Sequence, residues 1–404
     1  MTLNIQNMGL VSSIAAAFFA VVPAAADPAI DAPPATIAPT RAELAEAGLT
    51  FEANLIADLS KNVSGGVNAA GTFRHLFDFN ISLDMHKLAG VRGATFFADF
   101  QTKQGQDGSV ETGDLQAYSN IDGPDFTALY EIWYEQVFLE GDLRFKLGKI
   151  DANSEFAFVD FGGEFIHSSP GFSPTLFILP TYPDPAFGAV GLVGGNRGFY
   201  AGAGIFDGAL QEGISTGTRG PATLFGDPAD LFTIGEIGYR WGDEHAALSS
   251  RLALGLWHHT GTFDRFSGGT ASGATGYYLV LDQLLYKENE AADDTQGLGL
   301  FAQLGLADQD LSAIDRHIGI GFQWRGALPG RDADVIGLMA SWAGLSDEPG
   351  AGFTEDAELA VELFYELQLC AGLTLKPDVQ YIANPGGAGL DDAWVVTLRV
   401  EASF

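Results

Sequence analysis

Residues 129–157 read LYEIWYEQVFLEGDLRFKLGKIDANSEFA, and this stretch decides the fold. Apolar side chains such as Tyr134 and Phe145 recur at every second position, which is the period of a β-strand. The positions between them carry charge or an indole ring, as in Glu131, Trp133, Glu135, Arg144 and Lys146. Only residues 140–142 separate the two halves, so the sequence predicts an antiparallel hairpin with one apolar and one polar face.

Two environments accept such a hairpin. A soluble sandwich buries the apolar face, whereas a membrane barrel turns that face to lipid and its polar face to water. The stretches 49–60 and 72–84 also alternate nearly cleanly, and a tilted strand needs only about 9 to 11 residues to cross the apolar band. Because lipid cannot satisfy the backbone of an open sheet, a membrane-spanning form of this chain must be a closed barrel.

Further segments with this period complete a set of about 16 candidate strands, an even number as in single-chain bacterial barrels. Besides the two stretches above, the candidates are 93–101, 129–139, 142–150, 187–193, 197–206, 231–241, 248–258, 276–285, 297–306, 315–325, 334–343, 358–369, 372–382 and 393–404. The predicted fold is therefore all-β, a transmembrane antiparallel β-barrel.

The lengths of the connections give the barrel a direction. If the first strand starts in the periplasm, the long connections all fall on the extracellular side, where porins carry their long loops. These long connections are 102–128, 151–186, 207–230, 259–275 and 344–357. The shortest turns, among them 140–142 and 194–196, all fall on the periplasmic side.

The amino-terminal region resembles an export signal. The apolar run 9–26 ends in three alanines before Asp27, which predicts a signal peptide over residues 1–26 that is cleaved near Ala26, although residues 1–8 contain no Lys or Arg. Residues 27–48 are expected to form a periplasmic lead with a short helix over 41–48, capped by Thr40. Residues 49–404 would then form the barrel in the outer membrane.

Composition excludes several classes of partner. The chain has 20 Lys and Arg against 52 Asp and Glu, a formal net charge of −32. Nucleic acid and anionic membrane surfaces would be repelled, whereas cations or neutral solutes are compatible. The single cysteine, Cys370, allows no intrachain disulfide, and the seven histidines show no zinc spacing. We therefore expect neither a metal nor a cofactor.

The hairpin resembles the signature of the carbohydrate-selective, or glucose-selective, outer-membrane porins. Further segments agree with this family: SKNVSGG at 60–66, GATFFADF at 93–100, GDLQAYSNID at 113–122 and YPDPAFGAVG at 182–191. The resemblance implies a 16-stranded barrel narrowed by inward-folded loops, which passes small neutral sugars by facilitated diffusion. It also implies Asn where this chain has His167. The terminal Phe404 resembles the recognition signal of the outer-membrane barrel assembly machinery.

The candidate substrate path has two parts. In a 16-stranded barrel the polar face lines an aqueous channel, and the residues of inward parity are Arg74, Glu131, Trp133, Glu135, Arg144 and Lys146. The 36-residue connection 151–186 is long enough to be a folded functional loop. Its candidates are Asp151, Asn153, Glu155, Glu164, His167, Tyr182 and Asp184. Charged groups would exchange water for sugar hydroxyls, and aromatic rings would stack on the apolar faces of sugars.

Three functions stay open from the sequence. The first is the sugar porin, working as a monomer or homotrimer in outer-membrane lipid. The second is a general porin with a preference for cations, because the chain is so acidic. The third is a barrel-borne hydrolase, because residues 213–217 match G-x-S-x-G around Ser215. A nucleophile elbow needs a strand before the serine and a helix after it, and the motif falls in a predicted loop, so we expect no enzyme.

Overall fold

The computed structural model describes residues 40–195, 197–216, 223, 226, 228–242, 249–289, 291 and 294–404. The predicted signal peptide and most of the predicted lead, 27–39, lie outside this range. The predicted helix is present as α2 (Arg41–Ala47). Thr40 Oγ1 accepts from the backbone N–H of Glu43 at 3.3 Å, and the Glu43 carboxylate accepts from the backbone N–H of Thr40 at 2.7 Å, which makes a capping box.

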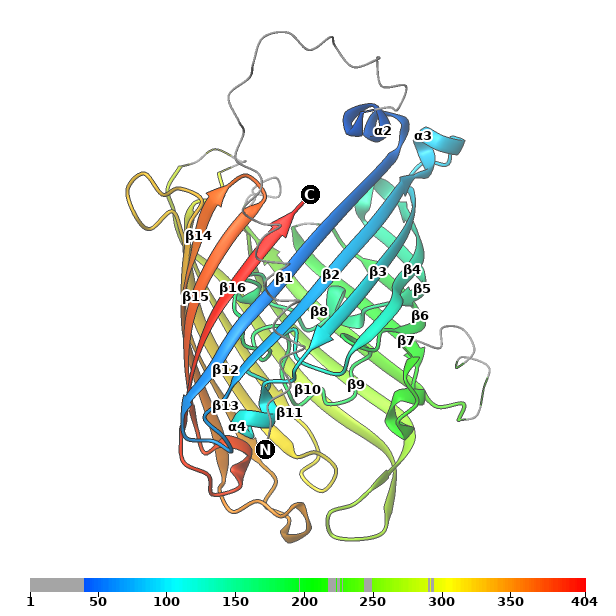
Figure 1. Cartoon of the computed structure of the whole chain (residues 1–404). Coiled ribbons are helices and arrows are strands. Elements are labelled where there is room, and N and C mark those ends of the chain that lie inside the picture. Colours follow the sequence, from blue (N-terminus) through cyan, green and yellow to red (C-terminus); the bar gives the residue numbers. More distant parts are fainter. Residues whose placement is uncertain are drawn as a thin grey trace. The chain divides into compact units, whose positions relative to one another are not determined.

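Sixteen strands form one closed antiparallel barrel, in which every strand pairs with its sequence neighbours and β1 pairs with β16 (Figure 1). This confirms the predicted fold and the predicted number of strands. The strands are β1 (Leu49–Ser64), β2 (Gly71–Asp84), β3 (Ala94–Gly105), β4 (Phe126–Phe138), β5 (Leu143–Ile150), β6 (Ala186–Val193), β7 (Gly198–Asp207), β8 (Leu231–Trp241), β9 (Ser250–Asp264), β10 (Thr270–Lys287), β11 (Gly297–Leu306), β12 (Ile314–Arg325), β13 (Val335–Leu345), β14 (Ala357–Cys370), β15 (Leu373–Ala383) and β16 (Ala393–Ser403).

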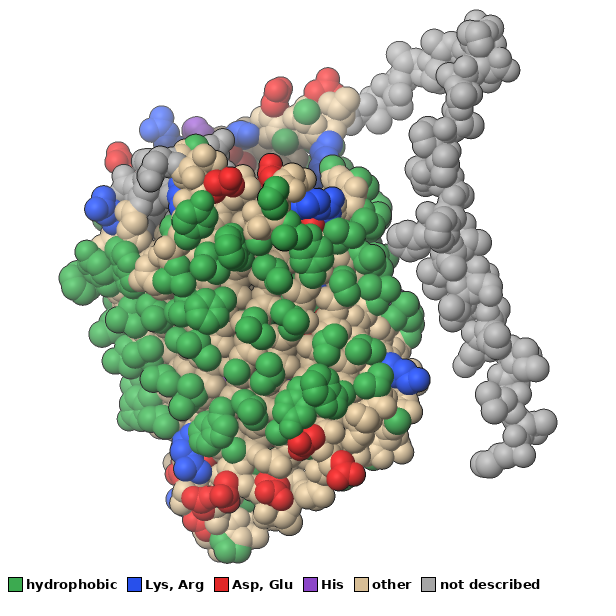
Figure 2. Space-filling model, turned by 90° about the vertical axis from the view of Figure 1, so that its left-hand side faces the viewer, with side chains coloured by type: hydrophobic (Ala, Val, Ile, Leu, Met, Phe, Trp, Pro, Cys, Tyr) green, Lys and Arg blue, Asp and Glu red, His purple; other side chains and the backbone are tan. Residues whose placement is uncertain are grey.

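The two faces of the sheet differ as the alternation predicts. Leu59, Phe73 and Phe77 are exposed on the outside, whereas the intervening Asp58 and Arg74 are buried inside. Figure 2 shows apolar side chains covering the middle of one face of the barrel, with most charged side chains gathered at its two ends. Such a belt is what a barrel presents to lipid. Among the described residues, no helix is long and apolar enough to cross a membrane.

The end of the barrel that is predicted to be periplasmic carries compact connections. After β2 comes the short helix α3 (Met85–Ala89), whose start is capped by the Asp84 side chain and whose end is capped by Gly90 in a left-handed conformation. After β4 comes a single 3-10 turn, η2 (Leu139–Gly141). The short turns predicted at 140–142 and 194–196 are confirmed, since residues 139–142 separate β4 from β5 and residues 194–197 separate β6 from β7.

One predicted loop is wrong. Residues 259–275 were expected to form a long connection, but β9 continues to Asp264 and β10 begins at Thr270, so only residues 265–269 connect them. Here the two strands keep pairing, from His259 with Ala274 to Asp264 with Thr270. The apolar alternation stops at polar residues such as Thr260 and Thr262, so this pattern did not predict that the strand continues.

The assignment of β2 side chains to the outer or the inner face predicts what a charge on the apolar outer face would do. Phe77→Arg places a guanidinium against lipid near the middle of β2 and should destabilise the folded barrel by roughly 2 to 4 kcal/mol. Urea unfolding in lipid vesicles, followed by heat-modifiable gel mobility, measures this loss. Asn80→Arg on the inner face of the same strand is the matched control, and equal destabilisation by both variants would contradict the assignment.

Candidate functional site

Two connections fold into the interior of the barrel (Figure 1). We call residues 106–125 loop 2 and residues 151–185 loop 3. Loop 2 contains the short helix α4 (Ser109–Thr112), and loop 3 contains two 3-10 turns, η3 (Ala152–Ser154) and η4 (Asp160–Gly162). The passage through the barrel is therefore the space that these two loops leave open.

Carboxylates on the barrel wall hold loop 3 by its backbone. The N–H groups of residues 151, 157 and 161 donate to Glu131 of β4 at 2.8 Å, Glu236 of β8 at 3.1 Å and Asp282 of β10 at 3.0 Å. Glu362 of β14 accepts from the two consecutive N–H groups of residues 166 and 167, at 2.7 and 3.0 Å. Buried backbone donors need such partners, so these four strands determine the course of the loop.

Loop 2 is held in the same way by Glu358 of β14. This carboxylate accepts from the N–H groups of Leu115 and Gln116 at 2.9 and 3.1 Å. It also accepts from the N–H of Gly386 at 2.6 Å, in the connection between β15 and β16. Glu358 therefore joins loop 2 to the wall and to a second extracellular connection.

Apolar packing fixes loop 3 against one side of the wall. Phe156, Phe161 and Phe165 belong to a buried cluster that includes inward side chains of β5 to β11, β13 and β14. Gly299 of β11 makes room for one of these rings, because a Cβ at this position would lie 2.0 Å from Phe161. Apolar packing and the wall carboxylates thus hold loop 3 against the same part of the inner wall.

Arg74 lies inside the barrel but is closed to solutes. Its guanidinium pairs with Asp122 of loop 2 at 2.9 Å, and its side chain is 0% exposed. Beside it, Arg399 of β16 makes a bidentate pair with Asp58 of β1, at 2.7 and 2.9 Å. The expectation that Arg74 borders the substrate path is therefore corrected, because loop 2 covers it and uses it as an anchor.

Five predicted site residues meet in one group, which we call the hairpin cluster. Arg144 of β5 pairs with Glu135 of β4 at 2.9 Å and with Glu155 of loop 3 at 2.6 Å, and its side chain stays 31% exposed. Lys146 also pairs with Glu155. The Lys146 ammonium lies 4.0 Å from the centre of the Trp133 ring, which stacks on Phe97 at 4.7 Å. These ion pairs thus join the hairpin of β4 and β5 to loop 3.

A second group of paired charges was largely missed from the sequence, and we call it the β15 cluster. Lys376 of β15 contacts Glu366 at 2.9 Å, Glu164 at 3.4 Å and Glu401 at 3.5 Å. Arg325 of β12 pairs with Glu164 at 2.9 Å, and these two side chains are 25% and 29% exposed. Only Glu164 was predicted, although the inward parity of Lys376 between Leu375 and Pro377 is a usable signal.

Asp151, Glu131 and Asn153 shape the start of loop 3. The Asp151 carboxylate accepts from the Tyr130 hydroxyl of β4, while Glu131 accepts from the Asp151 backbone. Burial raises the pKa of Asp151. The Asn153 amide donates to the carbonyls of residues 156 and 171, at 3.2 Å each. These polar groups are engaged mainly with the loop itself.

His167 is buried at 1% exposure, so the expectation that it borders the path is also corrected. Its Nδ1 accepts from the backbone N–H of Ser169 at 3.2 Å, and its Nε2 has no hydrogen-bond partner. Burial lowers the pKa of His167 to about 3. His317 of β12 is a second buried imidazole close enough to oppose a positive charge on His167. The ring is therefore a neutral packing element of loop 3.

Tyr182 and Asp184 lie nearer the extracellular mouth. They line a cavity of about 430 Å³ together with Phe172, Phe177 and other residues of loops 2 and 3. The Tyr182 hydroxyl donates to the carbonyl of residue 121 at 3.2 Å and so ties loop 3 to loop 2. The cavity lies between loop 3, Leu115 of loop 2, Leu210 and residues 312–314.

The G-x-S-x-G match does not have the setting of a nucleophile elbow. Ser215 follows the 3-10 turn η5 (Ala209–Glu212) rather than a strand, and its hydroxyl donates to the Asp184 carboxylate. Gly217 lies outside the described residues. No group of three or more His, Cys, Asp or Glu side chains that could hold a metal occurs in the part of the chain that the structure describes.

The His167 geometry predicts acid-dependent release of loop 3. A displaced loop would have a histidine pKa near 6.5, whereas the docked loop has about 3. Between these values only the displaced loop binds the proton, so docking weakens as the pH falls from about 6.5 towards 3. Limited proteolysis of loop 3 across this range measures the release, and His167→Asn should reduce its dependence on pH. An identical pH profile in wild type and variant would contradict this role.

The packing of Gly299 predicts a second way to displace the loop. Gly299→Ala forces a Cβ against the Phe161 ring, so loop 3 should move and single-channel conductance should rise and fluctuate more. Gly235→Ala on the outer face of β8 controls for adding a methyl group to the wall, since the nearest atom to a Cβ there is 3.8 Å away. Unchanged conductance in both variants would show that the loop relaxes without opening the lumen.

Comparisons with known proteins agree with this architecture. Porin B of Pseudomonas aeruginosa is 22% identical over 422 residues, which cover 90% of this chain and 89% of Porin B. The high-pH structure of Pseudomonas putida OprB matches at a TM-score of 0.79 and 20% identity, covering 90% of this chain and 96% of that one. Its low-pH structure matches at 0.57 and 18% identity, covering 90% and 95%. At these identities the structures support the fold alone.

The family assignment comes from the sequence. The family model described as carbohydrate-selective porin, OprB family, matches residues 70–404, which is most of the chain and nearly all of the barrel. The resemblance drawn from the hairpin is thereby confirmed. This chain belongs to the OprB family of carbohydrate-selective porins.

Proposed function

We propose that small neutral sugars cross the outer membrane through the part of the lumen that loops 2 and 3 leave open, by facilitated diffusion. Membership of a carbohydrate-selective porin family supports uptake of this class of solute. The observation that carries the proposal is the pairing of partly exposed charges inside the barrel. Both the hairpin cluster and the β15 cluster combine partly exposed guanidinium groups with carboxylates.

Paired charges suit a neutral hydroxylated solute. Each cluster offers strong donors and acceptors, so a sugar hydroxyl can exchange water for hydrogen bonds of similar strength. Because each guanidinium has a carboxylate beside it, the local field on a passing ion is small. We assign the main sugar contacts to Arg144 and Glu135 on one side, and to Arg325 and Glu164 on the other.

The acidic composition does not favour a general cation channel. Glu236, Asp282, Glu358 and Glu362 are buried, and each accepts hydrogen bonds from a loop backbone. These carboxylates are occupied with holding the loops and present no charge to a passing cation. The family assignment also makes the protein a channel rather than an enzyme, and we assign Ser215 no catalytic role.

The route to the membrane is part of the same proposal. Residues 1–26 would direct export and be removed near Ala26, and residues 27–48 would remain as a periplasmic lead before the barrel. Phe404 follows β16 with its side chain 64% exposed, which suits contact with the barrel assembly machinery. The working unit in outer-membrane lipid would be a monomer or a homotrimer.

Arg144 provides the direct test. Arg144→Gln removes a charged donor from the hairpin cluster, so the glucose concentration for half-maximal block should rise roughly tenfold. Single-channel current in planar bilayers measures this with glucose, a disaccharide and an uncharged non-sugar of similar size. Arg316→Gln is the matched control, because Arg316 is 42% exposed and pairs with Asp315 and Asp347 at the extracellular end of β12.

The pattern of block separates the alternatives. Saturable block by both sugars, with no block by the non-sugar, is the expected result for the wild type. Equal and linear effects of all three solutes, together with strong cation selectivity, would move the assignment to a general porin. An unchanged glucose response in Arg144→Gln would remove this residue from the sugar path.

A further inference from the structure

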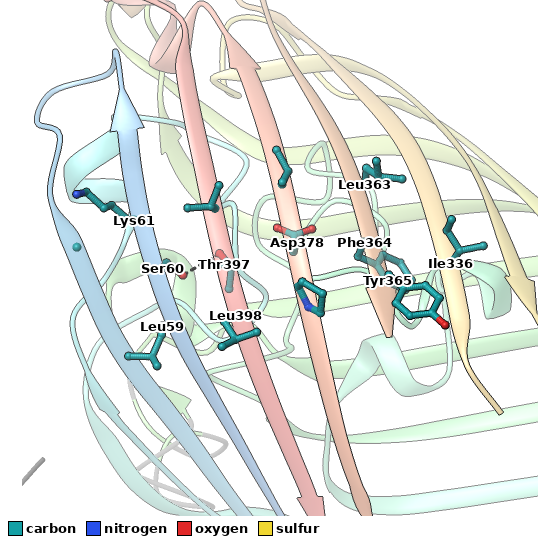
Figure 3. A pocket seen from close by; sticks show the side chains of 14 residues that line it. Leu59, Ser60, Lys61, Ile336, Leu363, Phe364, Tyr365, Asp378, Thr397 and Leu398 are labelled. Atoms are coloured by element: carbon teal, nitrogen blue, oxygen red, sulfur yellow. Dashed lines mark hydrogen bonds between the residues drawn. The ribbon is translucent and has the colours of Figure 1, made fainter. Parts of the chain in front are cut away.

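A groove of about 720 Å³ runs across the outer face of the barrel, away from the sugar path. Strands β1, β2 and β13 to β16 contribute to it, and Figure 3 shows its labelled side chains on these neighbouring strands. Its outward-facing lining is mainly apolar: Leu59, Leu363, Pro377, Val379, Val396 and Leu398. This hollow lies in the apolar belt, where the rest of the barrel wall meets lipid.

An interruption of the sheet lies within the groove. Phe364 pairs with Asp378 and Leu367 pairs with Leu375, but the residues between them are not paired across β14 and β15. Pro377 lies in this gap and has no N–H to donate to the ladder. On the far side, Gly71 of β2 is the partner of Lys61 and has no side chain to fill the surface.

The groove is inclined across the belt. Lys61 lies three residues before the extracellular end of β1, whereas Ile336 is the second residue of β13, at the periplasmic end. Both line the groove. Lys61 pairs with Val396, and Val379 pairs with both Val396 and Leu363, so the hollow runs across the strands from β1 towards β13. Because barrel strands are tilted, this direction is inclined to the membrane plane.

Lys61 gives the groove a charged end. Its side chain points outward and is exposed, between the apolar Leu59 and Val63 on the same face of β1. A lysine on a lipid-facing wall keeps its ammonium at the headgroup level while its stem lies along apolar surface. The chain as a whole carries a net charge of −32, but Lys61 presents a local positive charge that complements a single anionic headgroup at this level.

From these observations we infer that the groove binds a phosphorylated, multiply acylated lipid of the outer leaflet, with an acyl chain in the hollow at Pro377 and a phosphate at Lys61. The lipid face would thus carry a specific site and not only a general boundary layer. A second copy of this chain fits less well. Its wall is convex, so it would bridge the hollow instead of filling it.

Native mass spectrometry of the full-length protein in detergent tests this site, with bis-phosphorylated lipid A as the probe. Val379→Trp fills the groove and should lower the lipid adduct roughly fivefold or more. Leu398→Trp, on the neighbouring strand, repeats the test. Leu254→Trp on β9 is the matched control, because Leu254 is also exposed on the outer face but lies outside the groove. Heat-modifiable mobility verifies that all variants fold.

Lys61→Gln tests the headgroup. The wild type should prefer bis-phosphorylated over monophosphorylated lipid A, and this preference should shrink roughly fivefold in the variant. Equal loss of lipid in the groove and control tryptophan variants would mean unspecific boundary lipid and would overturn the inference. It would also be overturned if Val379→Trp abolished a dimer or trimer and left the lipid adduct unchanged. Neither result bears on sugar conduction.

Discussion

A membrane barrel has to satisfy every backbone hydrogen bond without water, and this constraint organises both of its faces. The outer wall meets it by closure, since β1 pairs with β16. The interior meets it differently, because loops 2 and 3 carry irregular backbone into the lumen. Their unpaired N–H groups donate to buried wall carboxylates such as Glu358 and Glu362. The carboxylates thus do for the loops what neighbouring strands do for the wall.

Because wall carboxylates hold the loops, only some of the polar side chains remain available to bind solutes. A carboxylate that accepts one or two backbone N–H groups is engaged and desolvated, so it cannot also bind a passing molecule at low cost. The polar groups that stay open belong to ion pairs, as in Arg144 with Glu135 and Arg325 with Glu164. A chain with a large negative charge can therefore present a nearly balanced passage to a neutral sugar.

Local pattern predicted what depends on local geometry. A period of two fixes which face of a strand a side chain occupies, and so all 16 strands and the inward parity of Trp133 and Lys146 followed from sequence. Burial inside the lumen depends on contacts between distant segments. Arg74 and His167 have the residue types of a binding site, yet loop folding covers them, and the closeness of Lys376 to Glu164 across 212 positions has no local signature. The need for a glycine at position 299 becomes clear only when the structure shows Phe161 packed against it.

Because side chains alternate along a strand, neighbouring residues of β15 lie on the lumen face and on the lipid face. Lys376 points inward to the β15 cluster, and its neighbour Pro377 points outward to the groove. Because Pro377 leaves this part of β15 unpaired with β14, the backbone there is held mainly by β16 and by the contacts of these two side chains. A shift of the strand towards one face necessarily moves the other. The ion pairs of the β15 cluster and the hollow in the apolar belt therefore meet at one local irregularity of the sheet, each on its own face.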